Sequence, residues 1–93
     1  MPAGLLTLEI ELPYAHSLKE KRAVLRRLMA RLRARFNVAI AEMDHQEAWQ
    51  RTALGVVSIS SSQPLLESSL RKVLEETERI LGQDVSRYTL DFF

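Results

Sequence analysis

The sequence contains no cysteine, and it has three glycines and one tryptophan among its 93 residues. Without cysteine there is no disulfide framework, no thiolate nucleophile and no thiolate metal site. The glycines stand far apart, at positions 4, 55 and 82. This spacing excludes a glycine-rich loop that cradles phosphate and the GxxG clamp of KH domains.

Long apolar runs are also missing, since no stretch approaches the roughly 20 residues that a membrane span needs. The N-terminal residues, MPAGLLTLEIEL, lack the basic region of a signal peptide, and acids alternate with their apolar residues. A chain of this length fits one domain, residues 1–93, with a single modest core. We therefore expect a cytoplasmic protein with no membrane partner.

No catalytic or metal-binding constellation is evident. Metal-ligating residue types gather only at Asp44, His45 and Glu47, and adjacency in sequence is not a coordination geometry. No serine has an indicated His and Asp partner pair. We expect no metal, no cofactor and no enzymatic activity. The alternative of a small enzyme depends on four charged residues converging at one end of a sheet: Lys19, Arg22, Glu42 and Asp44.

Four segments have the composition or the alternation of β-strands. Apolar residues alternate with polar ones from Leu5 to Leu12, which predicts a strand with one buried face. Further strands are expected at Val38 to Asp44, Thr52 to Ser60 and Ser86 to Phe93. Gly55 indicates a bulge or a close approach within the third of these strands.

Two segments have helical periodicity. Ser17 to Phe36 begins with a capping box, in which Ser17 accepts from the N–H of residue 20 and Glu20 reaches back to the N–H of Ser17. Asn37 is expected to end this helix in the left-handed conformation. A second helix has Pro64 in its first turn and stops at Gly82. We expect its exposed side to be mostly acidic, with Glu67, Glu75, Glu76 and Glu78.

The expected order of elements is β-α-β-β-α-β. Right-handed crossovers then place both helices on one face of a four-stranded antiparallel sheet, the ferredoxin-like α+β sandwich. The first and third strands are predicted to be central, and the second and fourth to be edges. The other face of the sheet has no helix over it, so it must be solvated or covered by a partner.

Charge is distributed unevenly along the chain. Ser17 to Phe36 carries eight positive residues and one negative residue, Glu20, so its net charge is +7. The whole chain is +1, which leaves −6 for the remainder. An apolar stripe runs along the same helix and anchors it to the sheet. The stripe consists of Leu18, Leu25, Leu28, Met29, Leu32 and Phe36, and the cations are Lys19, Lys21, Arg22, Arg26, Arg27, Arg31, Arg33 and Arg35.

This basic helix has two main interpretations, a solvated surface or a surface that binds RNA phosphates. An acidic protein partner and a membrane surface are further alternatives. The first strand offers Thr7, Glu9 and Glu11 to the uncovered sheet face, and the third strand offers no aromatic residue. RRM domains stack bases on aromatics of these strands. We therefore expect any RNA to bind the helix, through charge and shape rather than base edges.

Two motifs carry a resemblance to a known family. SLKEKR, from Ser17 to Arg22, and FNVAIAEMD, from Phe36 to Asp44, resemble motifs of the small bacterial YlxP-like proteins, also called the DUF503 family. Ala39 stands where serine is usual. The resemblance extends over almost the whole chain and includes the connector DHQEAWQR. It implies a ferredoxin-like domain of unestablished function, often encoded beside translation-initiation and ribosome-maturation factors.

The charge pattern and the resemblance together predict candidate residues. The motif residues are open to structural interpretations. These are helix caps for Ser17 and Asn37, strand-end charges that pair with a neighbouring arginine for Glu42 and Asp44, and packing for Trp49, whose other interpretations are a partner contact or base stacking. The expected function is a non-catalytic module that binds structured RNA or a ribosomal particle through the basic helix. The alternative is a protein-interaction or homodimerising domain with no direct nucleic-acid binding. The candidates for nucleic-acid binding are Lys19, Lys21, Arg22, Arg26, Arg27 and Arg33, and those for contact with a partner are Glu42, Asp44 and Trp49.

Overall fold

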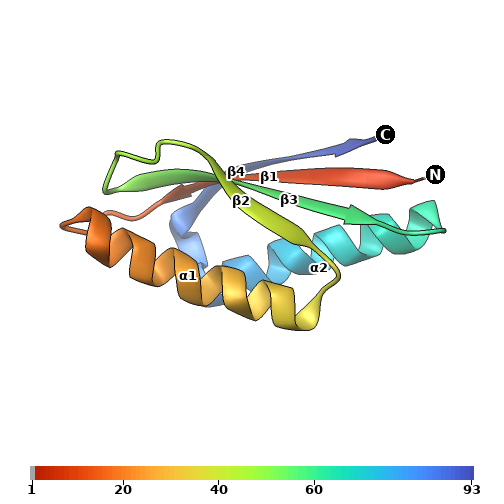
Figure 1. Ribbon diagram of the computed structural model, residues 1–93, viewed down its shortest axis with the longest axis horizontal. Helices are drawn as coiled ribbons and strands as arrows, with labels where there is room; N and C mark the ends of the chain where they lie inside the picture. Colours follow the sequence, from red (N-terminus) through yellow and green to blue (C-terminus); the bar gives the residue numbers. More distant parts are fainter. Residues whose placement is uncertain (1) are drawn as a thin grey trace.

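The computed structural model describes residues 2–93, apart from the side chain of Gln83, and its elements follow the predicted order (Figure 1). They are β1 (Ala3–Glu11), α1 (Leu18–Arg35), β2 (Ala39–Asp44), β3 (Arg51–Ile59), α2 (Gln63–Leu81), the short 3-10 helix η1 (Gly82–Asp84) and β4 (Val85–Phe92). The predicted boundaries of the helices and strands differ from these by at most two residues.

The strands form one antiparallel sheet in the order β2-β3-β1-β4. β1 and β3 are therefore central, and β2 and β4 are edges, as predicted. Both helices cover the same face, and the opposite face has no helix over it (Figure 1). The protein has the ferredoxin-like α+β fold.

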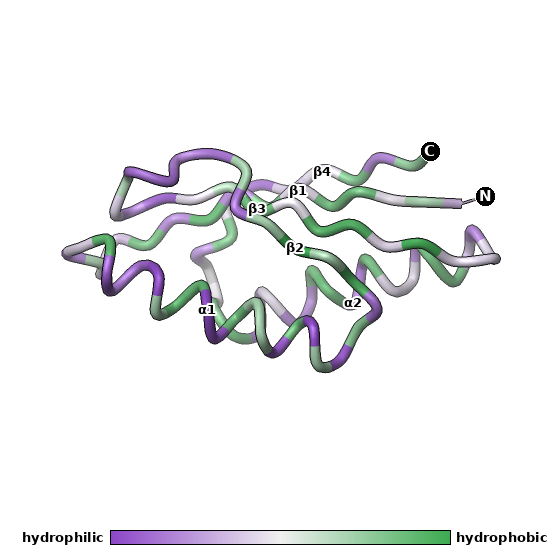
Figure 2. Tube along the Cα trace, in the orientation of Figure 1, coloured by the Kyte–Doolittle hydropathy of each residue, from purple (hydrophilic) through white to green (hydrophobic). Residues whose placement is uncertain are grey.

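The core lies between the sheet and the two helices. β1 directs Leu6, Leu8 and Ile10 into it, and all three side chains are fully buried. This follows from the alternation along the strand, which sends every second side chain to one face. The helices contribute buried residues at helical spacing, so hydrophobic and hydrophilic residues alternate along α1 (Figure 2). These helical residues are Leu25, Leu28, Leu32, Leu66, Leu70, Val73 and Leu74.

The uncovered face of the sheet is divided into an apolar half and a charged half. In the apolar half, Val57 on β3 lies beside Leu5 on β1 and Ala39 on β2. In the charged half, Glu9 lies between Ala53 and Arg87. The large apolar side chains on this face are well exposed: Met43 (61%), Val57 (48%), Ile59 (50%) and Phe93 (75%).

Gly55 marks a close approach, as its position in the strand predicted. A Cβ atom added at Gly55 would lie 2.9 Å from Cγ of Met43, so the methionine lies directly over the glycine. The bulge itself is on the neighbouring strand, where the β2–β3 register shifts between Glu42 and Asp44. The small residue in the central strand therefore gives room to the bulged edge strand.

The ends of α1 correct two details of the sequence analysis. Oγ of Ser17 accepts from the N–H of Glu20 at 3.1 Å, as predicted. The carboxylate of Glu20, however, accepts from the N–H of His16 rather than from that of Ser17. The prediction of a left-handed Asn37 is wrong, because among the described residues His45 is the non-glycine residue with positive φ. The helix instead ends at Phe36, whose backbone is extended.

Candidate nucleic-acid interface

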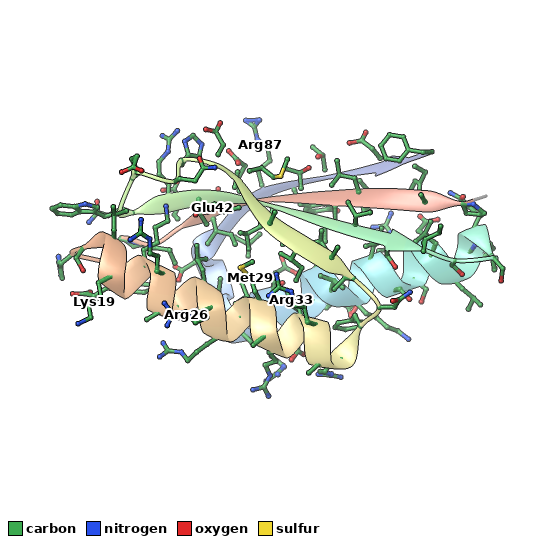
Figure 3. All side chains as sticks on the ribbon, viewed as in Figure 1. Lys19, Arg26, Met29, Arg33, Glu42 and Arg87 are labelled. Carbon is green, nitrogen blue, oxygen red and sulfur yellow. The ribbon has the colours of Figure 1, made fainter. Side chains whose placement is uncertain are left out.

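Seven of the eight cations in the α1 segment are exposed on the side of the helix away from the core. Lys19, Arg26 and Arg33 follow one another along the helix in Figure 3. The stripe of leucines described above fixes this orientation, because it anchors the opposite side of the helix to the sheet. We call these seven residues the basic surface: Lys19, Arg22, Arg26, Arg27, Arg31, Arg33 and Arg35.

The part of the basic surface that faces α2 is occupied by a carboxylate. Glu76 of α2 forms ion pairs with Arg31 at 3.3 Å and Arg35 at 2.9 Å, and its closest partner is Arg79 at 2.6 Å. The hydrogen bonds from Arg79, with the charge of Arg35, hold the pKa of Glu76 at about 2, although desolvation opposes this shift. The prediction that Glu76 is an exposed acid is wrong, since its relative exposure is 6%.

The rest of the basic surface is free for an external ligand. Among the described side chains, Lys19, Arg22, Arg26 and Arg27 form no ion pair and no hydrogen bond. Arg33 donates to the backbone oxygen of Ile40 at 3.0 Å and so covers part of the β2 edge. Four of the six predicted RNA-binding residues therefore form neither an ion pair nor a hydrogen bond with their side chains within the described chain.

Lys21 was predicted to be one of the cations that bind RNA, but its side chain is completely buried. Its ammonium group forms an ion pair with Glu42 at 2.8 Å and donates to the backbone oxygens of His45 at 2.6 Å and Ala48 at 2.7 Å. A buried charge requires such compensation, because leaving water without a partner is costly. Lys21 cannot reach a phosphate on the surface while it makes these contacts.

Glu42 and Asp44, predicted as partner contacts, have internal partners. Glu42 accepts from the hydroxyl of Thr52 at 2.6 Å in addition to its ion pair with Lys21. The Asp44 side chain is 72% exposed and accepts from the N–H of His45 at 2.8 Å. The carboxylate of Glu42 is thus engaged by Lys21 and Thr52 although its side chain is 21% exposed, whereas Asp44 stays accessible at the end of β2.

A groove lies between α1 and the edge strand β2. It has a volume of about 290 Å³, and Arg22, Arg26 and Arg33 line it together with Met29 and Glu42. At about 1.5 Å per residue, the first and last of these arginines are roughly 16 Å apart along the helix. The groove therefore offers a row of guanidinium groups, each able to donate two parallel hydrogen bonds to a phosphate.

Trp49 lies on the connector between β2 and β3 and is 51% exposed. The connector is drawn largely in the hydrophilic colour in Figure 2. It lies at the same end of the molecule as the start of α1 (Figure 1), where Gln50 donates to the backbone oxygens of Pro13 and Ala15. The structure therefore brings the connector that carries Trp49 close to the first turns of the basic helix.

Two features of this helix were not predicted from the sequence: the carboxylate that pairs with part of the basic surface, and the buried lysine. A signal for Lys21 was present, since it stands three residues after Leu18 and four before Leu25, within the apolar stripe. Glu76 is three residues after the buried Val73, at the margin of the apolar stripe of α2. Its three arginine partners come from two helices, which spacing within one helix does not reveal.

The described part of the chain contains neither a cluster of metal ligands nor a membrane-spanning helix. Within residues 2–93 there is no group of three His, Asp or Glu residues placed to hold a metal ion. No helix in the same range is long and apolar enough to cross a membrane.

Comparison with known proteins identifies the family. A family model described as "Protein of unknown function (DUF503)" matches residues 3–89. The chain belongs to the DUF503 family. Within the family, the uncharacterized protein YlxP of Bacillus subtilis (strain 168) is 50% identical over 60 residues. This match spans 64% of the present chain and 65% of YlxP, just under two thirds of that relative.

Solved structures similar to this DUF503 protein share its fold. A de novo designed protein with a ferredoxin fold has a TM-score of 0.54 at 10% sequence identity, over 100% of this chain and 83% of that one. A putative antibiotic biosynthesis monooxygenase from Bordetella bronchiseptica has a TM-score of 0.51 at 14% identity, over 100% and 96% of the two chains. At these identities the likeness concerns the fold alone.

The SLKEKR motif of this DUF503 protein mostly builds structure. Ser17 and Glu20 cap α1, and Lys21 bonds the β2–β3 connector. Lys19 and Arg22 are the two cations of the motif that remain exposed. The motif thus joins a helix start, a buried ion pair and the beginning of the basic surface within six residues.

Proposed function

We propose that this DUF503 protein is a cytoplasmic, non-catalytic module that binds structured RNA or a ribosomal particle through α1. The observation that carries the proposal is the unpaired charge of Lys19, Arg22, Arg26 and Arg27 on the exposed side of one helix. Such a row of cations attracts a polyanion, and arginine matches the geometry of a phosphate. The genomic context of the family, beside translation factors, favours RNA over other polyanions.

The two sides of the basic surface contribute unequally to this function. Arg31 and Arg35 are already partly neutralised by Glu76, so they offer less attraction to a phosphate. Arg22 and Arg26 line the groove beside β2 with Arg33. We therefore expect the RNA backbone to lie along the β2 side of α1, with its phosphates on these arginines.

The experiment compares two charge-reversed variants of the full chain. Arg22→Glu/Arg26→Glu removes cations from the basic surface, and Arg71→Glu/Lys72→Glu removes the same charge from the exposed side of α2. Binding to ribosomal particles and to a structured RNA is measured by sedimentation and filter binding across a salt series. Only the α1 variant should bind more weakly. Its plot of log association constant against log salt concentration should become less steep, by about 1.4 to 1.8 in slope for two lost phosphate contacts.

Circular dichroism provides the check that both variants remain folded. The proposal is contradicted if the wild-type protein binds neither probe at low salt. Equal loss of binding in both variants would also contradict it, because binding would then follow net charge rather than the α1 surface.

A second candidate function is self-association through the uncovered face of the sheet. Its apolar half exposes Met43, Val57, Ile59 and Phe93, a larger grouping than the isolated apolar residues of an ordinary surface. A two-fold axis along the strands would place apolar half on apolar half. It would also bring the acids and arginines of the two charged halves together, including Glu9 and Arg87.

Sedimentation equilibrium tests this second candidate. The wild-type chain should dimerise at micromolar concentration, and Val57→Glu should dissociate the dimer. The matched control is Leu65→Glu, which places the same charge on an exposed leucine of α2, 64% exposed. A wild-type chain that stays monomeric at high micromolar concentration excludes the dimer and leaves the RNA proposal intact.

A further inference from the structure

Hydrogen bonds hold the β2–β3 connector to α1 and to the segment that precedes α1. The Lys21 ammonium group donates to the backbone oxygens of His45, Gln46 and Ala48, and the last of these is the residue before Trp49. On the other side of Trp49, the side-chain amide of Gln50 donates to the backbone oxygens of Pro13 and Ala15. The backbone oxygen of Gln50 accepts from the N–H of Leu12. The backbone of Trp49 is therefore fixed on both sides.

The fixed backbone nevertheless presents an exposed indole. Trp49 is 51% exposed, and a shallow depression of about 420 Å³ surrounds it. The other residues that line this depression are Glu47, Ala48, Gln50 and Arg51. A tryptophan used only for packing would sit in the core with apolar neighbours, whereas this one has hydrogen-bonding neighbours and no second large apolar side chain.

We propose that Trp49 is a stacking platform for an unpaired RNA base, and that the cations at the start of α1 hold the adjoining phosphates. The proposal deepens the RNA-binding function above and depends on it. It assigns the ligand class, because a base inside a continuous duplex cannot stack on a side chain, whereas a loop, bulge or single strand can supply one.

The surroundings of Trp49 fit a nucleobase better than an apolar protein anchor. A nucleobase has apolar faces and polar edges, so it suits an indole bordered by the polar side chains of Glu47, Gln50 and Arg51. An anchor residue of a protein partner would more often meet a cluster of apolar contacts that excludes water. Glu47 and Arg51 carry opposite charges, so the net attraction for the phosphates comes from the helix.

The helix is bonded to the connector that carries Trp49. Ala48, next to Trp49, bonds directly to Lys21, and Arg22 follows Lys21 on the exposed side of α1. Lys19 is in the same first turns (Figure 3). A nucleotide stacked on Trp49 thus has cations nearby for its phosphate, and the next phosphates can continue along the groove to Arg26.

The chain supplies its own probe, since Trp49 is its single tryptophan. Tryptophan fluorescence of the full chain is followed while three ligands of equal length are added: oligouridylate, oligoadenylate and a fully paired RNA duplex. Stacking quenches the indole, so we expect the single strands to quench it at saturation. The duplex should produce little change even where it binds the basic surface.

Three substitutions separate stacking from other roles. Trp49→Ala should weaken single-strand binding roughly 5- to 150-fold, the range for loss of one base–aromatic stack. Trp49→Phe keeps an aromatic ring and should retain most of the affinity, while Trp49→Leu keeps only apolar character and should behave like Trp49→Ala. Tyr88→Ala is the control, because Tyr88 is a comparably exposed aromatic on β4 (44%) and should leave binding unchanged. Binding of these variants is measured by filter binding.

Each result supports or overturns the assignment. Quenching by single strands, with affinities in the order Trp, Phe, then Leu and Ala, supports it. RNA binding with unchanged fluorescence and unchanged affinity of Trp49→Ala overturns the platform but leaves the basic surface as the RNA site. Equal affinity of the Leu variant and the wild type shows an apolar contact instead of stacking. Absence of any RNA binding, or loss only of a protein partner in Trp49→Ala, overturns the assignment as well.

Discussion

Lys21 and Arg22 are neighbours in the sequence and carry the same charge, yet the fold uses them in opposite ways. Lys21 is completely buried and bonds a carboxylate and three backbone oxygens, whereas Arg22 is exposed and lines a groove. The α2 side of the helix repeats the contrast more weakly, because Arg31 and Arg35 share Glu76. The net charge counted along the α1 segment is thus larger than the charge that is available to a ligand at its surface.

The paired and the unpaired cations also have different roles, in stability for the first set and in the proposed binding for the second. The inner cation and the Glu76-bound arginines stabilise contacts between elements that are distant in sequence. The outer cations contact no described acid, so nothing in the fold requires their charge. Substitutions at the two sets should therefore have separable effects, on unfolding for the inner set and on binding for the outer set.

The largest expected effect comes from removing the inner cation. Lys21→Ala leaves Glu42 and several backbone oxygens without their partner, and loss of one member of a buried pair costs about 3–5 kcal/mol in the free energy of unfolding. Lys19→Ala is the matched control on the exposed side and should change this free energy by less than about 0.5 kcal/mol. Urea denaturation measures both. Similar values for the two variants would remove the distinction between inner and outer cations.

A smaller effect is expected from the pH dependence of the Glu76 cluster. The pKa of Glu76 is about 2 in the folded protein and lies below its ordinary value of 4.5, so the ionised carboxylate is favoured by folding. The resulting stability is fully present above the ordinary pKa and is lost as the pH falls from about 4.5 to 2. The urea midpoint of the wild type should fall across this window more steeply than that of Glu76→Gln. Parallel pH profiles would show that the three arginines do not stabilise the carboxylate.

The smallest effect distinguishes two exposed arginines of one helix. Arg35→Ala removes an ion pair with Glu76 of 2.9 Å and should cost up to about 1 kcal/mol, the usual range for an exposed pair. Arg26→Ala removes no ion pair among the described residues and should stay within about 0.5 kcal/mol of the wild type. Thermal unfolding in low and high salt measures both. Salt should reduce the cost of Arg35→Ala, and a larger cost for Arg26→Ala would contradict the assignment.

Much of the fold was predictable because its signals are local. The alternation of Leu6, Leu8 and Ile10 predicted the buried face of β1, and Ser17 predicted the start of α1. Sequence order and crossover handedness then predicted the positions of the strands. The conformation of Asn37 was not predictable in this way, because an extended Phe36 ends the helix before it.

The candidate site was predictable only as a set of charges. Helical spacing correctly assigned Lys19, Arg22, Arg26 and Arg27 to the surface. It predicted no partner for Lys21, whose contacts lie 21 to 27 residues further along the chain. It also predicted none for Arg31, whose partner Glu76 is 45 residues away. The anchoring of Trp49 depends on the same distant contacts.

By itself the sequence determined the order of elements, the face that each presents to the core, and the excess of positive charge on α1. Hydrophobic periods of 2 and 3.6 residues are properties of short segments, so these features needed no knowledge of the folded chain. Only the tertiary structure decided which cations remain available to a ligand. An ion pair forms where two elements meet in space, and the Lys21–Glu42 and Arg31–Glu76 pairs exist because α1 packs beside β2 and α2.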